Sequence, residues 1–199
     1  MIAREAYWYL MPVIVITAIL QFSFPLFTIP FWLLAFALLY LFRTPEVNLS
    51  SDPLALVSPV NSTVSNISTA TDPYLKREAI RIDFDMNLSD PYTLLSVTEG
   101  KIMNFWMKHP DKTDSDRVRT VWIQTDEKDD AVMEVHASRS GQVMCYQAAG
   151  ERVGQGKKCG FLPFGAKVVV YLPKDCVIEV AQGDRVSAGQ DIIAHWPRS

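Results

Sequence analysis

The sequence is poor in cysteine, histidine and net positive charge, and each shortage excludes a class of protein. Its three cysteines are odd in number and widely spaced, which fits neither a disulfide framework nor a zinc-ligand pattern. The formal net charge of −3 gives no electrostatic support for a nucleic-acid partner. The three histidines lie in different predicted elements, so we expect no metal site: His109, His136 and His195.

Charged residues are absent from residues 7–42, and this long apolar run predicts a membrane segment. Pro25 and Pro30 interrupt the run, because proline breaks a helix interior. We therefore expect a hairpin of two short helices, Tyr7–Phe24 and Phe31–Phe42. Each is shorter than the roughly 20 residues of a full span, so the hairpin is either transmembrane in a locally thinned bilayer or re-entrant.

Arg4 and Arg43 flank this run, and the positive-inside rule places both on the cytoplasmic side. We expect a membrane hairpin at residues 1–43 and a cytoplasmic domain at residues 44–199, attached to the inner (cytoplasmic) membrane. The expected partners are membrane phospholipid and an integral membrane protein. Five basic side chains could contact lipid phosphates, although such charges often only face solvent: Arg43, Arg152, Lys157, Lys158 and Lys167.

The chain after residue 43 contains short runs of β-branched and aromatic residues and no long amphipathic helical pattern. Ala79–Phe84 alternates apolar and polar residues, as a half-buried strand does, and Arg119–Thr125 is a further strand candidate. Val64–Ile67 predicts a shorter strand, and Lys167–Leu172 a buried one that Pro173 closes. The domain is therefore predicted to be mainly β.

One motif, G-(E/D)-R-V-x-x-G, occurs twice, at residues 150–156 and 183–189. Each copy predicts a turn between strands, with valine pointing inward and glycine adopting a positive φ. Paired motifs of this kind resemble the barrel-sandwich (biotinyl/lipoyl-like) folds, whose two halves are related by a quasi-two-fold axis. The repeat predicts a barrel-sandwich domain, although the modifiable lysine that carrier domains present at a hairpin tip is missing.

Several segments together resemble the short, membrane-anchored prokaryotic phosphatidylserine decarboxylases over nearly the whole chain. The two most specific are Gly150–Pro173, which matches a motif ending in F-G-S-x-V-x-x-x-L-P, and Gly183–Ala194, which matches G-D-x-V-x-A-G-x-x-(I/V)-A. Three shorter segments match F-F-R-(D/N)-P-E-R, V-x-S-P-A-D-G and F-M-S-P-x-D-V-H in turn: Leu41–Glu46, Leu56–Ser62 and Asp85–Tyr92.

The resemblance implies a chemistry in which a serine hydroxyl attacks the carbonyl of the preceding glycine and the chain is cut. The new N-terminal pyruvoyl group then forms a Schiff base with the substrate amine and accepts electrons as CO₂ leaves. An Asp and a His assist the serine. Here the glycine is Gly165, but the serine position is Ala166, the Asp is Asn61 and the His is Tyr92; Asp90 remains from D-V-H.

Because alanine has no nucleophile, we expect no pyruvoyl cofactor and no intact catalytic site. Three functions stay open. The chain is a catalytically degenerate relative that binds phospholipid or serves as an accessory subunit of a membrane complex, an active decarboxylase whose self-cleavage serine has been mutated, or a structural subunit that offers only a docking surface. The simultaneous loss at Asn61, Tyr92 and Ala166 favours the first.

Overall fold

A computed structural model describes residues 6–23, 28–41, 52, 54–110, 118–137 and 143–197. The chain forms two compact units, Met1–Pro45 and Glu46–Ser199, which are described separately here. The assignment of the first unit to a membrane and of the second to the cytoplasm stays a prediction.

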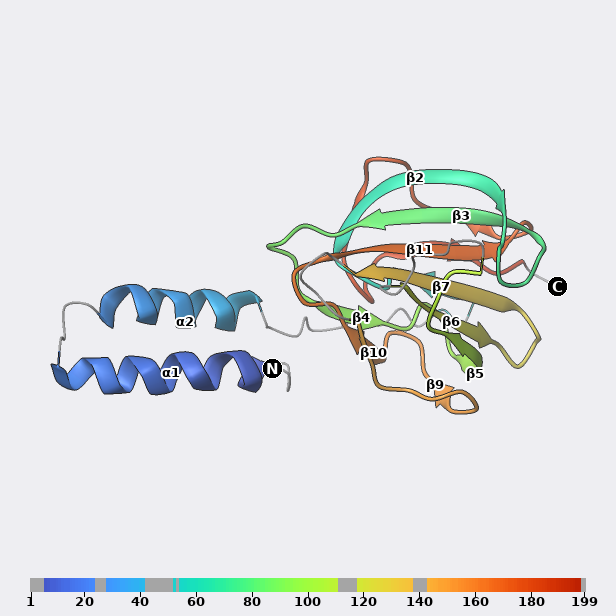
Figure 1. The fold of residues 1–199 in the computed structure, drawn as a ribbon. Coiled ribbons are helices and arrows are strands. Elements are labelled where there is room, and N and C mark those ends of the chain that lie inside the picture. The colour runs from blue at the N-terminus through green and yellow to red at the C-terminus, as the bar shows by residue number, and fades with distance from the viewer. Residues whose placement is uncertain are drawn as a thin grey trace. The chain divides into compact units, whose positions relative to one another are not determined.

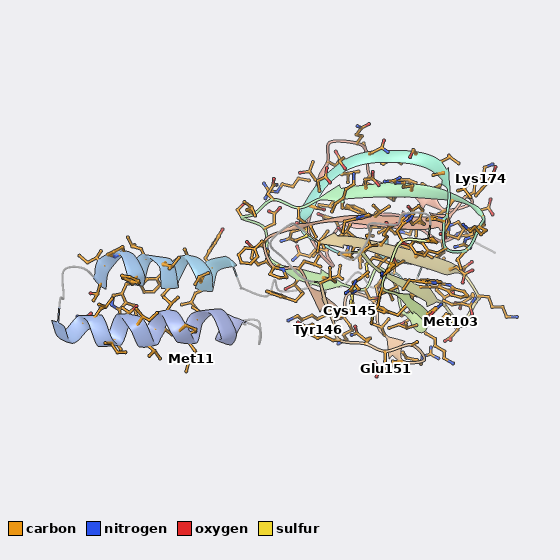
Figure 2. The ribbon with its side chains drawn as sticks, viewed as in Figure 1. Met11, Met103, Cys145, Tyr146, Glu151 and Lys174 are labelled. Carbon is orange, nitrogen blue, oxygen red and sulfur yellow. The ribbon has the colours of Figure 1, made fainter. Side chains whose placement is uncertain are left out.

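The first unit is a helical hairpin in which α1 (Ala6–Ser23) and α2 (Ile29–Leu41) lie side by side (Figure 1). Among the described residues, neither helix combines the length and the hydropathy needed to cross a membrane. Met11 lies on the side of α1 that faces away from α2 (Figure 2). Many other large apolar side chains are also exposed, among them Ile14, Val15, Ile19, Trp32, Leu33 and Phe36.

In the described residues of the second unit, all the regular elements are β-strands, which are joined by turns and loops. This confirms the prediction of a mainly β domain. Its largest sheet has eight strands and curls into a half-barrel (Figure 1). The strands of this sheet, in spatial order, are β13 (Arg185–Val186), β2 (Ser62–Thr71), β3 (Glu78–Asp85), β11 (Ala166–Pro173), β7 (Asp130–Ala137), β6 (Val118–Gln124), β5 (Gly100–Trp106) and β9 (Arg152–Val153).

Two three-stranded sheets complete the domain. Their strands are β1 (Ala55–Val57), β14 (Ile192–His195) and β12 (Val177–Ile178) in one, and β4 (Thr93–Leu95), β10 (Lys158–Phe161) and β8 (Met144–Cys145) in the other. The strands expected at Ala79–Phe84, Arg119–Thr125 and Lys167–Leu172 are present as β3, β6 and β11. The strand expected at Val64–Ile67 is longer, because β2 pairs with β3 as far as Thr71.

The main core lies against one face of the large sheet, which we call the inner face. Alternation along β11 sends Val168, Val170 and Leu172 into this core, where they meet Met133 and Val135 of β7. The opposite, outer face carries the remaining residues of each strand, because successive side chains of a strand point to opposite sides.

The two copies of the repeated motif form the two edges of the large sheet. Gly150 and Gly183 have φ values of 94° and 96°, as the sequence predicted for these glycines. Each motif clamps one strand through two backbone hydrogen bonds. In the first copy, Gly150 N–H donates to Ile102 O at 2.7 Å, and Ile102 N–H donates to Glu151 O at 2.8 Å. In the second copy, Gly183 N–H donates to Val64 O and Val64 N–H donates to Asp184 O, both at 2.8 Å. Val64 of β2 and Ile102 of β5 are therefore equivalent positions.

A buried carboxylate, that of Glu134, lies on the outer face with only 1% of the residue exposed. His136 Nε2 lies 2.6 Å from Glu134 Oε1 and His109 Nε2 lies 3.9 Å from the same oxygen, while Tyr171 OH donates to Oε2 at 3.2 Å. Burial raises the pKa of Glu134, but the hydrogen bond and charge of His136, aided by His109 and Tyr171, outweigh it and lower the pKa overall. The two histidines thus converge on one acid, although they belong to different elements.

Replacing Glu134 by Gln is expected to lower the free energy of unfolding by about 2 kcal/mol at neutral pH. Because the pKa of Glu134 is lowered in the folded state, this contribution is complete above the unfolded carboxyl pKa of about 4.3 and is lost as pH falls through the folded value. Urea denaturation of the full chain in detergent, repeated across the acid range, measures it. Asp126→Asn, which removes an exposed ion pair with Arg152, is the control and should change little. A stability difference between Glu134→Gln and the unmodified chain that grows in acid would contradict this assignment.

Candidate functional site

The turn between β10 and β11 contains the position that the sequence identified as the reaction centre. Phe164 and Gly165 have φ values of 65° and 80°, so two successive residues adopt the left-handed conformation. That conformation suits glycine and strains phenylalanine. A Cβ on Gly165 would lie 3.5 Å from Met86 O, an ordinary contact, so it is the backbone conformation rather than space that favours glycine here.

The loop that follows β3, residues 86–92, lies against this turn and is hydrogen-bonded to it at both ends. Met86 N–H donates to Ala166 O at 3.1 Å, and Leu162 N–H donates to Tyr92 O at 2.8 Å. The rings of Tyr92 and Phe164 lie 6.2 Å apart. The fold therefore brings the segment that carries Asp90 and Tyr92 to the Gly165–Ala166 turn.

Tyr92 is buried, and its hydroxyl group forms a hydrogen bond within its own loop. Its hydroxyl donates a hydrogen bond to Leu88 O at 2.8 Å, and its ring lies edge-on to Phe161 at 6.1 Å. Burial raises the pKa of Tyr92 above its usual value, so the phenol stays neutral near pH 7 and is a poor base.

Asp90 is also buried, with its side chain 3% exposed, and it joins the loop to the second copy of the repeat. One carboxylate oxygen accepts a hydrogen bond from Asn87 N–H at 2.9 Å, and the other accepts one from Arg185 Nη2 at 2.9 Å. Asn61 is bound to the same copy, because its Oδ1 accepts a hydrogen bond from Ala188 N–H. Asp90 and Asn61 are thus both tied to residues 185–188.

The side chain of Ala166 points to the inner face and packs against the main core, as Ala137 and Cys145 do. The position equivalent to the expected nucleophile therefore presents a methyl group in apolar surroundings. Among the described residues, no three His, Cys, Asp or Glu side chains lie close enough together to hold a metal ion.

A cavity of about 610 Å³ opens near the same apolar cluster, since Cys145 belongs to both. Its walls come mainly from Phe105, Met107, Arg119, Val143, Cys145 and Gln147. Arg119 Nη1 donates to the carbonyls of Met107 (2.9 Å) and Val118 (2.8 Å), which holds the guanidinium in place. Burial raises the pKa of the Cys145 thiol to about 11, so this thiol is neutral. Cys145 and its exposed neighbour Tyr146 are marked in Figure 2.

The sequence contained no motif that marks this cavity, and Arg119 was not among the candidate residues. Its walls come from three separate stretches of chain, so only the arrangement of β5, β6 and the strand β8 assembles them. Arg119 lies opposite Val135 of β7 and so occupies an inward-facing position, which is unusual for a charged side chain.

The basic residues predicted to meet lipid phosphates do not form one patch. Lys157 is exposed, and Lys158 Nζ lies over the rings of Tyr146 (5.1 Å) and Phe161 (5.6 Å). Two others are engaged elsewhere: Arg152 pairs with Asp126 at 2.7 Å, and Lys167 pairs on the outer face with Asp83 at 3.2 Å. Arg43 lies outside the described residues.

Comparison with known proteins gives a consistent result. The family model described as "Phosphatidylserine decarboxylase" matches residues 34–194. A phosphatidylserine decarboxylase proenzyme of Nitrosomonas europaea is 29% identical over 205 residues, covering 98% of this chain and 95% of the relative. Proenzymes of the same name are 32% identical in Burkholderia lata (84% and 83% covered) and 30% identical in Burkholderia pseudomallei (98% and 95% covered). No solved structure matches this chain significantly.

Replacing Asp90 by Ala is expected to lower the free energy of unfolding by about 2 kcal/mol, because it removes a buried acceptor of two hydrogen bonds. Arg185→Gln is the matched control, since the arginine side chain is 72% exposed and its loss leaves the bond to Asn87 N–H intact. Thermal unfolding followed by circular dichroism compares the two. An Asp90→Ala variant as stable as the unmodified chain would mean that Asp90 does not hold the loop.

Proposed function

Since this chain belongs to the phosphatidylserine decarboxylase family, we propose that it is a non-cleaving member, which binds phospholipid at a membrane without decarboxylating it. In this proposal it acts as an accessory subunit of a membrane complex. The alternative is an active decarboxylase whose self-cleavage serine has been mutated; the names of the relatives support the family and do not decide between the two.

The observation that carries the proposal is the methyl group of Ala166. The family's self-cleavage requires a side-chain oxygen next to Gly165, and alanine supplies none, so no pyruvoyl group is expected at this turn. Two further positions support this reading. Asn61 accepts a hydrogen bond from a backbone N–H and cannot take up a proton, and Tyr92 is a buried neutral phenol. The glycine of the family motif is present at this turn, while the groups that would act on it differ from the motif.

The cavity around Arg119 supports the assignment of phospholipid as ligand. Its apolar walls suit an acyl chain or glycerol backbone, and its volume is within the range of small-molecule sites. Arg119 suits a phosphate, because guanidinium groups bind phosphate oxygens through paired hydrogen bonds. Lys157 and Lys158 stay candidates for contact with lipid headgroups.

The helical hairpin and the repeat support the rest of the expected architecture. We place α1 and α2 against the cytoplasmic membrane, because their exposed apolar side chains are better accommodated by lipid than by water. We place the β domain in the barrel-sandwich class and on the cytoplasmic side. The equivalent clamps at Gly150 and Gly183, on opposite edges of one sheet, support a quasi-two-fold domain.

The natural chain is expected to stay in one piece of 22.5 kDa when its intact mass is measured after expression. Ala166→Ser alone should also stay uncut, because Asn61 and Tyr92 cannot assist the new hydroxyl. The triple variant with Ala166→Ser, Asn61→Asp and Tyr92→His is expected to cut after Gly165. Two natural fragments, the second beginning with a pyruvoyl group, would establish the alternative of an active decarboxylase.

Arg119→Gln is expected to weaken phospholipid binding by about tenfold, which corresponds to one lost charge-assisted hydrogen bond. The measurement is the affinity of the full chain in detergent for short-chain phosphatidylserine, with phosphatidylcholine as comparison. Lys174→Gln, at an exposed lysine that pairs with Glu78 and was not among the candidate lipid contacts, is the control and should leave affinity unchanged. If Arg119→Gln bound phospholipid as tightly as the natural chain, the cavity would not be the lipid site. If the natural chain bound neither lipid, only the function as a docking surface would remain.

A further inference from the structure

The turn that follows β3 presents an apolar side chain to solvent. Leu88 is 67% exposed, which is more than any other large apolar side chain in the described part of the second unit. Its neighbours Asn87 and Ser89 are exposed as well, and none of the three carries a charge. Because single exposed leucines are common on soluble proteins, this exposure by itself points to no partner.

The backbone around Leu88 is held in place, which distinguishes it from an apolar residue on a loose loop. Asp90 N–H donates to Asn87 O at 3.1 Å, and Asn87 N–H donates to Asp90 Oδ2 at 2.9 Å. The hydroxyl of Tyr92 donates to Leu88 O at 2.8 Å. Asp90 and Tyr92 are themselves buried, so groups inside the domain hold the leucine out in water. Such pre-organisation lowers the cost of binding a partner at this turn.

A guanidinium group is attached to the same turn. Arg185 Nη2 donates to Asp90 Oδ1 at 2.9 Å, while 72% of the arginine side chain is exposed. The nearby exposed carboxylate of Asp85 lies 4.0 Å from Lys167 Nζ, which offsets its charge. Guanidinium groups bind phosphate oxygens through paired hydrogen bonds. The turn therefore combines an apolar tip with a cation suited to phosphate.

This combination fits the interface of a phospholipid bilayer. There the phosphates form a layer just outside the acyl chains, so an apolar tip and an adjacent cation meet their partners together. A protein partner would need a much larger complementary surface, about 800 Å² on each side. Leu88 has polar neighbours on both sides in the chain, Asn87 and Ser89, which suits a local insertion better than a broad apolar contact.

The length of the chain between the two units makes one weak contact sufficient. Ala55 at the start of β1 follows Leu41 at the end of α2 by fourteen residues. A chain of this length reaches at most about 50 Å. With the hairpin attached to a membrane, the β domain stays within this distance of the lipid. Its effective concentration there is high, so an insertion of a single leucine can orient it.

We propose that the turn at residues 87–90 enters the interface of the membrane, with Leu88 at the upper acyl chains and Arg185 at the lipid phosphates. In Figure 1 this turn follows the arrowhead of β3, and Figure 2 labels Lys174 at the opposite end of the β3–β11 pair. The inference rests on the membrane placement of the hairpin in the proposed function. It adds the end of the β domain that contacts lipid.

Fluorescence quenching of the full chain in lipid nanodiscs tests the insertion. An environment-sensitive dye on Ser89→Cys should be quenched by lipids that carry spin labels on their acyl chains. Adding Leu88→Asp should abolish the quenching, while Leu88→Met should preserve it. Because Leu88 is exposed, neither change should alter thermal unfolding. The same dye on Lys174→Cys, which is equally open to solvent, should not be quenched.

Absence of quenching at Ser89→Cys, or quenching that persists with Leu88→Asp, would overturn the proposal. The native Cys159 and Cys176 are buried and Cys145 is half-buried, so the unmodified chain treated with the dye supplies the background. A dye on Ile19→Cys of α1 reports the hairpin separately. Quenching at position 19 without quenching at position 89 would overturn the insertion and leave the membrane placement of the hairpin intact. No quenching at position 19 would instead contradict that placement.

The phosphate contact has its own test in nanodiscs that contain anionic lipid. Arg185→Gln should reduce the quenching of the dye on Ser89→Cys, because the turn then loses its contact with the phosphate layer. Lys174→Gln, which also removes one exposed charge, is the control and should leave the quenching unchanged. Equal quenching with Arg185 and with Arg185→Gln would contradict the assignment of this arginine to lipid phosphate.

Discussion

The pairing of β11 with β3 on one side and with β7 on the other is the constraint on which this domain depends. The two ladders run from Lys167–Asp85 to Pro173–Ala79 and from Ala166–Ala137 to Tyr171–Val132. They fix which β11 side chains enter the core and which face outward. They also fix the start of the strand, so that the Gly165–Ala166 turn meets the loop after β3 at the point where the β3–β11 ladder ends.

The geometry of the Gly165–Ala166 turn depends on backbone and ring interactions. Its left-handed residues, its hydrogen bond from Met86 N–H and its contact with Tyr92 involve backbone atoms and aromatic rings. None of these interactions involves a hydroxyl at position 166. The backbone geometry of this turn is therefore compatible with the alanine at position 166.

The candidate site residues divide into two groups by their contacts. Tyr92 lies in the loop that contacts the turn, whereas Asn61 and Asp90 are connected to residues 185–188 of the second repeat. The repeat, which the sequence indicated only as a feature of the fold, thus also supports the candidate site. On the outer face, Glu134 performs a comparable structural task by joining His109, His136 and Tyr171.

The sequence by itself determined the features that depend on neighbouring residues: the presence of β3, β6 and β11, the positive φ of Gly150 and Gly183, and the absence of a nucleophile at Ala166. These follow from local sterics and from the type of one side chain. Only the tertiary structure decided the length of β2, the convergence of two histidines on Glu134, and the cavity around Arg119. Each of these joins residues far apart in the chain, and their proximity depends on strand order and register, which local periodicity does not encode.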